Sequence, residues 1–199
     1  MMAMASCGEG NQNVKNETTM EEGKNAVIEN IMARRSIRKY KNEVVSREVL
    51  DQIMECGINA PNGQNKQSWE VRVVDNPQVM EEINKTLNAA YPKMENAAGC
   101  FRGAPVMVFI ARDKGYDFSA YDCGLMAENM MLAAQSLGVG SICLGSPVRF
   151  INDSPACAPI LERLGFSEDY EFCLCVGLGY PDEAPAAKPR DKGKVKYVE

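Results

Sequence analysis

The sequence predicts an α+β or α/β fold built on a central sheet, because helical and strand patterns alternate along the chain. A near-continuous apolar run at residues 105–111 is typical of a strand that is covered on both faces. A long apolar pattern at residues 119–137 leaves little polar face and predicts a helix buried almost all round. With 199 residues, 45% of them hydrophobic and 25% charged, the chain fits a single globular domain.

The first half of the chain alternates helix and strand. Apolar side chains within residues 27–32 recur at helical spacing and predict a short amphipathic helix. Ser46 is a typical N-cap for a second helix, whose apolar positions continue to residue 58. Residues 69–73 alternate apolar and polar side chains, as in a half-buried strand, and Asn76-Pro77 then opens a third helix.

The second half continues the pattern after the long helix, which Gly138 ends. We expect a short strand at residues 141–144, a helix from Ser154-Pro155 to Gly165, and a last strand at residues 171–178. The long helix is either the core of one subunit or half of a dimer interface. Its methionines favour core packing, although a Met-rich face also suits an adaptable ligand surface.

The ends of the chain differ from its middle in composition. Residues 1–22 lack periodicity and predict a disordered lead, so that residues 23–199 form one domain with an extended arm from about residue 181. Met4-Ala5-Ser6-Cys7 is weakly similar to a lipoprotein cleavage site, but no basic residue or long apolar core precedes it. A longer natural start would revive that reading. The sequence contains no apolar run long enough to predict a membrane span.

Composition excludes several classes of chemistry. The chain has no histidine, which excludes Ser-His-Asp hydrolysis and zinc proteases of the H-E-x-x-H type. A bound cofactor is therefore the simplest source of difficult chemistry. The net charge is −5, from 22 basic and 27 acidic residues, so a basic cluster in this chain needs a specific explanation. Nothing in the charge balance points to a nucleic-acid partner.

Eight scattered cysteines form no C-x-x-C motif. Cys173 and Cys175 alternate with apolar residues in a strand pattern, which favours packing as small apolar side chains over zinc binding. We therefore expect no metal site and a reducing, cytoplasmic setting. A cysteine-based redox or metal protein remains a third functional class, with enough thiols but no motif.

Three cations and a hydroxyl fall within Arg34-Arg35-Ser36-Ile37-Arg38, directly after the first helical pattern. Guanidinium groups bind phosphate or carboxylate oxygens in pairs, so this concentration favours an anionic ligand such as a phosphorylated small molecule. The alternative is a solvated helix end that satisfies terminal carbonyls, and for this motif alone the two readings are about equally supported.

Two further segments favour a ligand. Residues 60–69, here called the amide loop, are rich in Asn and Gln, whose planar donors and acceptors suit the edge of a heteroaromatic ring. Lys188-Pro189-Arg190 supplies a second cationic pair near the C-terminus, which can close over the same anion. In this order the three segments resemble the FMN-dependent nitroreductase family, over roughly residues 25–192.

The resemblance implies a three-layer α+β fold with a mostly antiparallel sheet, and a homodimer with the long helix at its interface and FMN between the subunits. It assigns Arg34, Arg35 and Ser36 to the FMN phosphate and ribityl chain, and Arg38 to the N1/O2 edge of the ring. The remaining implied cofactor-binding residues are Pro61, Asn62, Asn65, Gln67, Leu144, Gly145, Lys188 and Arg190. Ser68 departs from the family pattern, in which many relatives carry proline, and this casts slight doubt on the rigidity of the loop.

The implied activity is a two-step, ping-pong transfer of hydride equivalents from NAD(P)H through FMN to an electron-poor small molecule such as a nitroaromatic or a quinone. Neither Gly138-Val139-Gly140 nor Gly177-Leu178-Gly179 lies between a strand and a helix, so a resident dinucleotide-binding domain is not expected. Two alternatives stay open: an FMN- or nucleotide-binding sensor or carrier without turnover, and a dehalogenating or flavin-processing relative. The acceptor and the choice between NADH and NADPH also stay open.

Overall fold

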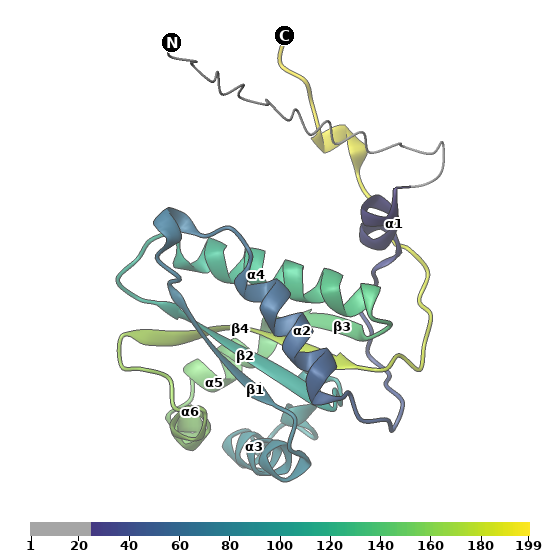
Figure 1. Ribbon diagram of the computed structural model, residues 1–199. Coiled ribbons are helices and arrows are strands. Elements are labelled where there is room, and N and C mark those ends of the chain that lie inside the picture. The colour runs from purple at the N-terminus through teal and green to yellow at the C-terminus, as the bar shows by residue number, and fades with distance from the viewer. Residues whose placement is uncertain (1–24) are drawn as a thin grey trace, which may run out of the picture.

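An antiparallel sheet forms the middle layer of the computed structural model, which describes residues 25–199 (Figure 1). Within those residues the sheet has four strands in the order β1-β2-β4-β3. Their bounds are β1 (Trp69–Val74), β2 (Val106–Asp113), β3 (Gly140–Leu144) and β4 (Tyr170–Gly179). Every neighbouring pair in the sheet is antiparallel, so the α+β prediction is confirmed and the α/β alternative is wrong.

Helices cover both faces of the sheet, which gives three layers (Figure 1). One face carries α2 and α4, and the other carries α3, α5 and α6. The helices are α1 (Ala26–Ala33), α2 (Arg47–Ile58), α3 (Pro77–Ala90), α4 (Ser119–Ser136), α5 (Ser146–Asn152) and α6 (Ala158–Leu164). None of the helices within residues 25–199 combines the length and apolar character needed to cross a bilayer.

Side-chain caps fix where several helices begin. The Ser46 hydroxyl accepts a hydrogen bond from the Val49 amide at 3.4 Å at the start of α2. Asn76 caps α3 in the same way, and Pro77 occupies its first turn, where a missing N–H costs nothing. Gly165 ends α6 with a φ of 63°, a left-handed conformation that glycine adopts without strain. These helix boundaries agree with the sequence predictions.

Strand β2 lies at the centre of the core. Met107 and Phe109 point into the layer of α3, α5 and α6, whereas Val108 and Ile110 point into the layer of α2 and α4, and all four are fully buried. Phe109 packs against Phe172, with ring centroids 5.6 Å apart. The prediction of a strand covered on both faces is confirmed, and it explains why this segment is apolar throughout.

Helix α4 is buried on one face only, so the prediction of burial almost all round is wrong for the single chain. Met126 and Met130 face the sheet and are inaccessible to solvent, which confirms that the methionines are core residues. On the opposite side Tyr121 is 69% exposed and Leu125 is 46% exposed. The pattern reports that the side chains are apolar, but a single chain supplies a packing surface for only one side of this helix.

Some segments differ from the sequence predictions. Helix α5 was not predicted, and the helix expected from Ser154 begins as a 3-10 turn, Pro155–Cys157, before α6. Beyond residue 181 the arm contains one short 3-10 turn, Lys192–Lys194, among the described residues. The expected lead at residues 1–22, with Cys7 in it, lies outside the described residues.

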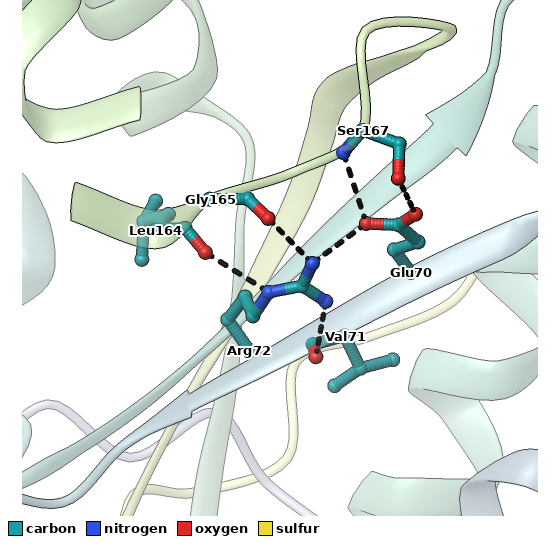
Figure 2. A network of polar contacts seen from close by, with 6 residues as sticks. All are labelled: Glu70, Val71, Arg72, Leu164, Gly165 and Ser167. Atoms are coloured by element: carbon teal, nitrogen blue, oxygen red, sulfur yellow. Dashed lines mark hydrogen bonds and ion pairs between the residues drawn. The ribbon is translucent and has the colours of Figure 1, made fainter. Parts of the chain in front are cut away.

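A polar network fastens the edge strand β1 to the end of α6 (Figure 2). Glu70 accepts a hydrogen bond from the Ser167 hydroxyl at 2.5 Å and pairs with the Arg72 guanidinium at 2.7 Å. Arg72 also donates to the main-chain oxygens of Leu164 and Gly165. Burial would raise the pKa of Glu70, but the hydrogen bonds from Ser167 and the Arg72 charge outweigh it and lower that pKa.

Candidate functional site

The segment after α1 lies along the free edge of β3. Ser36 forms a parallel bridge with Ser141, and the Ile37 amide donates to the Ser141 oxygen at 2.9 Å. The Ile37 side chain is buried, which fixes the segment against the fold. The basic residues on both sides of Ile37 are thereby held at one end of the sheet.

The C-terminal arm is attached to the same segment. Tyr40 forms an antiparallel bridge with Pro181, and the Asp182 amide donates to the Lys39 oxygen at 2.9 Å. One carboxylate oxygen of Glu183 accepts hydrogen bonds from the main-chain amides of Arg38 and Lys39. This carboxylate therefore fixes the arm at the point where it approaches the basic segment, a role that the sequence did not reveal.

A cavity of about 390 Å³ lies between α1, the segment that follows it and the C-terminal arm, which run close together in Figure 1. This volume is within the range of small-ligand sites. Six of the twelve predicted site residues line the cavity: Arg34, Arg35, Ser36, Arg38, Lys188 and Arg190. Residues separated by about 150 positions along the chain thus contribute to one site.

Three arginines of this cavity bind main-chain oxygens and not carboxylates. Arg35 donates to the Met32 oxygen at 2.6 Å, Arg38 to the Ser36 oxygen at 3.0 Å and Arg190 to the Lys188 oxygen at 3.1 Å. Arg34 approaches the Glu128 carboxylate at 4.0 Å. In the part of the chain that the structure describes, the other four cations form no ion pair with an acidic side chain. An anionic ligand would supply that partner.

The amide loop is held by a buried carboxylate at the start of α4. Asp122 accepts a hydrogen bond from the Gly63 amide at 3.0 Å and another from the Ser68 hydroxyl at 2.8 Å. Asp122 and Ser68 are both buried. Ser68 therefore fixes the loop by a hydrogen bond, which answers the doubt about rigidity that its departure from proline raised. Sequence reasoning missed Asp122, although a single acid near the start of an apolar helix was a visible signal.

The backbone of the amide loop is strained. Gln64, Asn65 and Gln67 have φ angles of 56°, 54° and 51°, in the left-handed region that non-glycine residues rarely occupy. The Asn62 side chain accepts a hydrogen bond from the Gln67 amide at 2.9 Å and closes the turn. Such conformations persist only where surrounding contacts enforce them, and they concentrate at functional sites.

Tyr116 packs under the loop at its glycine. A Cβ atom added to Gly63 would lie 2.1 Å from the Tyr116 hydroxyl oxygen, so only glycine fits. The Lys66 ammonium lies 4.2 Å from the centroid of the Tyr116 ring. These contacts hold the loop in place from the side opposite its exposed amides.

The loop does not reach the basic cavity of its own chain. Asp122, which holds the loop, and Glu128, which is near Arg34, are six residues apart on α4, or about 9 Å along the helix axis. The cavity is not lined by the other six predicted site residues, which are Pro61, Asn62, Asn65, Gln67, Leu144 and Gly145. Gly145 is exposed after β3, and a Cβ atom there would meet nothing within 4 Å, so its backbone is open to close approach.

Comparison with known proteins identifies the family. The sequence model that describes the nitroreductase family matches residues 31–180 of this chain. The chain belongs to the nitroreductase family. A member with bound FMN from Bacteroides fragilis is 30% identical with a TM-score of 0.79, and covers 88% of this chain and 100% of its own. A nitroreductase with bound FMN from Desulfitobacterium hafniense is 34% identical with the same TM-score, and the match covers 89% of this chain and all of the other.

Among proteins compared by sequence, the NADPH-flavin oxidoreductase of Vibrio harveyi is 32% identical over 182 residues. That match covers 83% of this chain and 70% of the Vibrio protein. The family named from the three segments is thus confirmed, and the three-layer antiparallel fold expected of a nitroreductase agrees with the solved structures.

Proposed function

We propose that the protein is an FMN-dependent oxidoreductase, which passes hydride equivalents from NAD(P)H to an electron-poor acceptor such as a nitroaromatic or a quinone. The observation that carries the proposal is the cavity in which arginines and a lysine from both ends of the fold meet, four of them without an acidic partner in residues 25–199. The FMN bound in the similar structures from Bacteroides fragilis and Desulfitobacterium hafniense, and the similarity to the NADPH-flavin oxidoreductase of Vibrio harveyi, support it.

The residues of the cavity fit the phosphate and ribityl chain of FMN. Arg34, Arg35, Lys188 and Arg190 provide cationic donors, and the Ser36 hydroxyl both donates and accepts. The guanidinium groups of Arg35 and Arg190 now bind neutral main-chain oxygens, contacts that a phosphate dianion can replace at little cost because charged acceptors bind more strongly. We assign these five side chains to the phosphate end of the cofactor.

Arg38 and Gly145 are assigned to the ring. When bound, FMN supplies the hydride-transfer chemistry that the side chains of a histidine-free chain lack. Arg38 carries a permanent charge that would stabilise negative charge at the N1/O2 edge. The open backbone at Gly145 leaves room for a planar ring to approach the main chain near N5.

The amide loop is assigned to the site of a second subunit. None of its predicted site residues, Pro61, Asn62, Asn65 and Gln67, lines the cavity of its own chain. Asp122, which holds the loop, is also about 9 Å along α4 from Glu128, which is near Arg34. A two-fold axis that places two α4 helices antiparallel would bring the loop of each subunit to the cavity of the other. We therefore propose a homodimer with FMN at the interface.

Exposed apolar side chains support this dimer. None of the residues of α1 is buried, and Val27, Ile28 and Met32 are each more than half exposed. Tyr121 and Leu125 are exposed on the outer side of α4. Exposed apolar side chains on two helices of a charged protein are typical of a subunit interface.

The phosphate assignment is tested by titrating FMN into protein stripped of cofactor. Arg190→Ala should raise the dissociation constant for FMN about 10- to 150-fold, because a charge-assisted hydrogen bond contributes about 1.5 to 3 kcal/mol. Lys192→Ala removes an exposed charge of the same arm outside the cavity and should have little effect. Riboflavin, which lacks the phosphate, should bind both variants as it binds wild type. An equal loss of riboflavin affinity in Arg190→Ala would contradict the assignment.

The shared site is tested by mixing two defective variants. Asn65→Ala alters the amide loop and Arg190→Ala alters the cavity, so a mixed dimer would contain one intact site if the two segments come from different subunits. Refolding an equal mixture should then restore wild-type FMN affinity at about one quarter of all sites. If both segments of a site belong to one chain, mixing restores none. Sedimentation of the wild type as a monomer would also exclude the dimer.

Turnover separates the reductase from a binding module. The purified yellow protein should be bleached anaerobically by NADH or NADPH, and a quinone or nitroaromatic should restore the colour. Parallel double-reciprocal plots are expected, because donor and acceptor use one pocket in turn. A yellow protein that no reduced nicotinamide bleaches would instead be a flavin-binding module. The free cysteines in residues 25–199 favour a reducing compartment, which we take to be the cytoplasm.

A further inference from the structure

Two cysteines pack into the same layer between α4 and β4, away from the basic cavity. Cys123 lies on α4 beside Asp122 and is inaccessible to solvent, with its Sγ atom 3.8 Å from the Ala111 oxygen. Cys173 lies on β4, is partly exposed, and packs against the buried cluster that contains Cys123. The pKa of each thiol is shifted by the other, which places the two side chains near each other. None of these contacts belongs to the site proposed for FMN.

A β-bulge brings Cys173 to this position. On β2, Ile110 pairs with Leu174 while its neighbour Ala111 pairs with Phe172, so Cys173 is an extra residue without a partner. Phe172 packs in the core layer of α3, whereas both Cys173 and Leu174 pack toward α4. In a regular strand, residues 173 and 174 would face opposite sides. The bulge re-aims Cys173 onto the helix that carries Cys123.

The surroundings give the two sulfur atoms different properties. The hydrogen bond from Cys123 lowers the pKa of Cys173, burial opposes this effect, and the nearby Arg112 guanidinium adds to the lowering. The same hydrogen bond together with burial raises the pKa of Cys123. Cys173 is therefore the more acidic of the two thiols, and it is also the accessible one. This is the asymmetry of a dithiol in which one cysteine attacks and the other resolves.

We propose that Cys173 and Cys123 form a peroxide-reactive dithiol, with Cys173 as the attacking thiol and Cys123 as the resolving thiol. The Cys173 thiolate attacks one oxygen of hydrogen peroxide, so that an S–O bond forms, the O–O bond breaks and hydroxide leaves to take up a proton. The Cys123 sulfur then attacks the Cys173 sulfenic acid, so that the S–S bond forms and the S–O bond breaks. Water leaves with the Cys123 proton. Two electrons pass from the two thiols to the peroxide.

Exposure alone predicts a different order of reactivity. Cys56 on α2 is more exposed than Cys173, so if access decided the matter it would be oxidised first. Cys157 is fully buried and serves as the unreactive reference. The proposal therefore requires that Cys173 reacts faster than the more exposed Cys56, and that its product is a link to one particular partner.

The experiment uses wild-type protein with its cofactor, a few equivalents of hydrogen peroxide, and quenching with an alkylating reagent before digestion and mass spectrometry. The expected product is a peptide pair joined through Cys123 and Cys173, lighter by two hydrogens and separated again by dithiothreitol. Cys56 should remain free for alkylation at the same time. Oxidation of Cys56 at the same rate as Cys173, or Cys173 driven to sulfinic acid with no link to Cys123, would overturn the proposal.

Two variants sharpen the assignment of roles. In Cys123→Ser the sulfenic acid at Cys173 has no thiol partner, so a 1,3-diketone probe should label Cys173 several-fold more than in wild type. In Cys173→Ser the buried Cys123 should be unreactive toward peroxide. If either variant does not fold, iodoacetamide rates on the native wild type decide the matter, because Cys173 must be alkylated faster than Cys56. Slower alkylation of Cys173 than of Cys56 would contradict the assignment of Cys173 as the attacking thiol.

Discussion

Asp122→Ala tests the claim that one buried carboxylate holds the amide loop. Asp122 accepts hydrogen bonds from the Gly63 amide at 3.0 Å and the Ser68 hydroxyl at 2.8 Å, and the substitution leaves both donors without that partner. Each hydrogen bond to a charged acceptor contributes about 1.5 to 3 kcal/mol, so the expected loss from the two bonds is on the order of 3 to 6 kcal/mol. That is a large share of the ~5 to 15 kcal/mol typical of a whole domain.

Urea denaturation followed by the fluorescence of the single tryptophan, Trp69, measures this loss next to the loop. Ser68→Ala is the matched comparison, because it removes one of the two hydrogen bonds and should cost about half as much. Asp117→Ala removes an exposed acid just before α4 and should change the free energy of unfolding by less than about 0.5 kcal/mol. The reasoning is refuted if Asp122→Ala costs no more than Asp117→Ala.

Three further predictions follow from single contacts. Glu183→Ala should weaken FMN binding several-fold in a fluorescence titration, because it frees the arm from two main-chain amides. The urea midpoint should be nearly unchanged, since the core is not opened. A lower midpoint with intact FMN affinity would contradict this. Glu70→Gln should be less stable than wild type at neutral pH, because the pKa of Glu70 is lowered in the folded chain. That difference should shrink as the pH falls from about 4.5, where the unfolded chain takes up the proton, through the lower pKa of the folded chain, and a difference that does not depend on pH would refute it. Gly63→Ala should lower the melting temperature, because the added methyl group clashes with the Tyr116 hydroxyl. Adding Tyr116→Phe removes that hydroxyl and should restore part of the lost melting temperature. No recovery in the double variant would count against this contact.

The sequence predicted the elements whose boundaries are set by local chemistry. Ser46 and Asn76 cap helices through their own side chains, so their neighbours along the chain suffice to place α2 and α3. Helix α5 was missed because it is seven residues long and begins at Ser146 without a side-chain cap. Its stability comes from burying Ile151 against residues far away in the chain, which no local pattern records.

The candidate site also combines residues that the sequence could predict with residues that it could not. Arg34-Arg35-Ser36-Ile37-Arg38 is visible as a candidate anion site from residue types, although alone it is equally consistent with a solvated helix end. Its meeting with Lys188 and Arg190 was suggested by resemblance to a family, because proximity across about 150 residues leaves no local trace. Asp122 and Glu183 act through hydrogen bonds to residues more than 50 positions away, and each looks like an ordinary acid in sequence. Periodicity likewise showed that α4 is apolar but not what covers each of its sides.

The position of the C-terminal arm separates the residues that build the layered body from those that complete the cavity. All four strands and six helices within residues 25–199 precede Lys188 and Arg190 in the chain, so the layered body contains neither of the two cations that the arm adds to the anion site. A polypeptide that stops shortly after Gly179 would keep the whole sheet and lose the carboxylate that fixes the arm. Premature termination there should yield a folded but colourless protein.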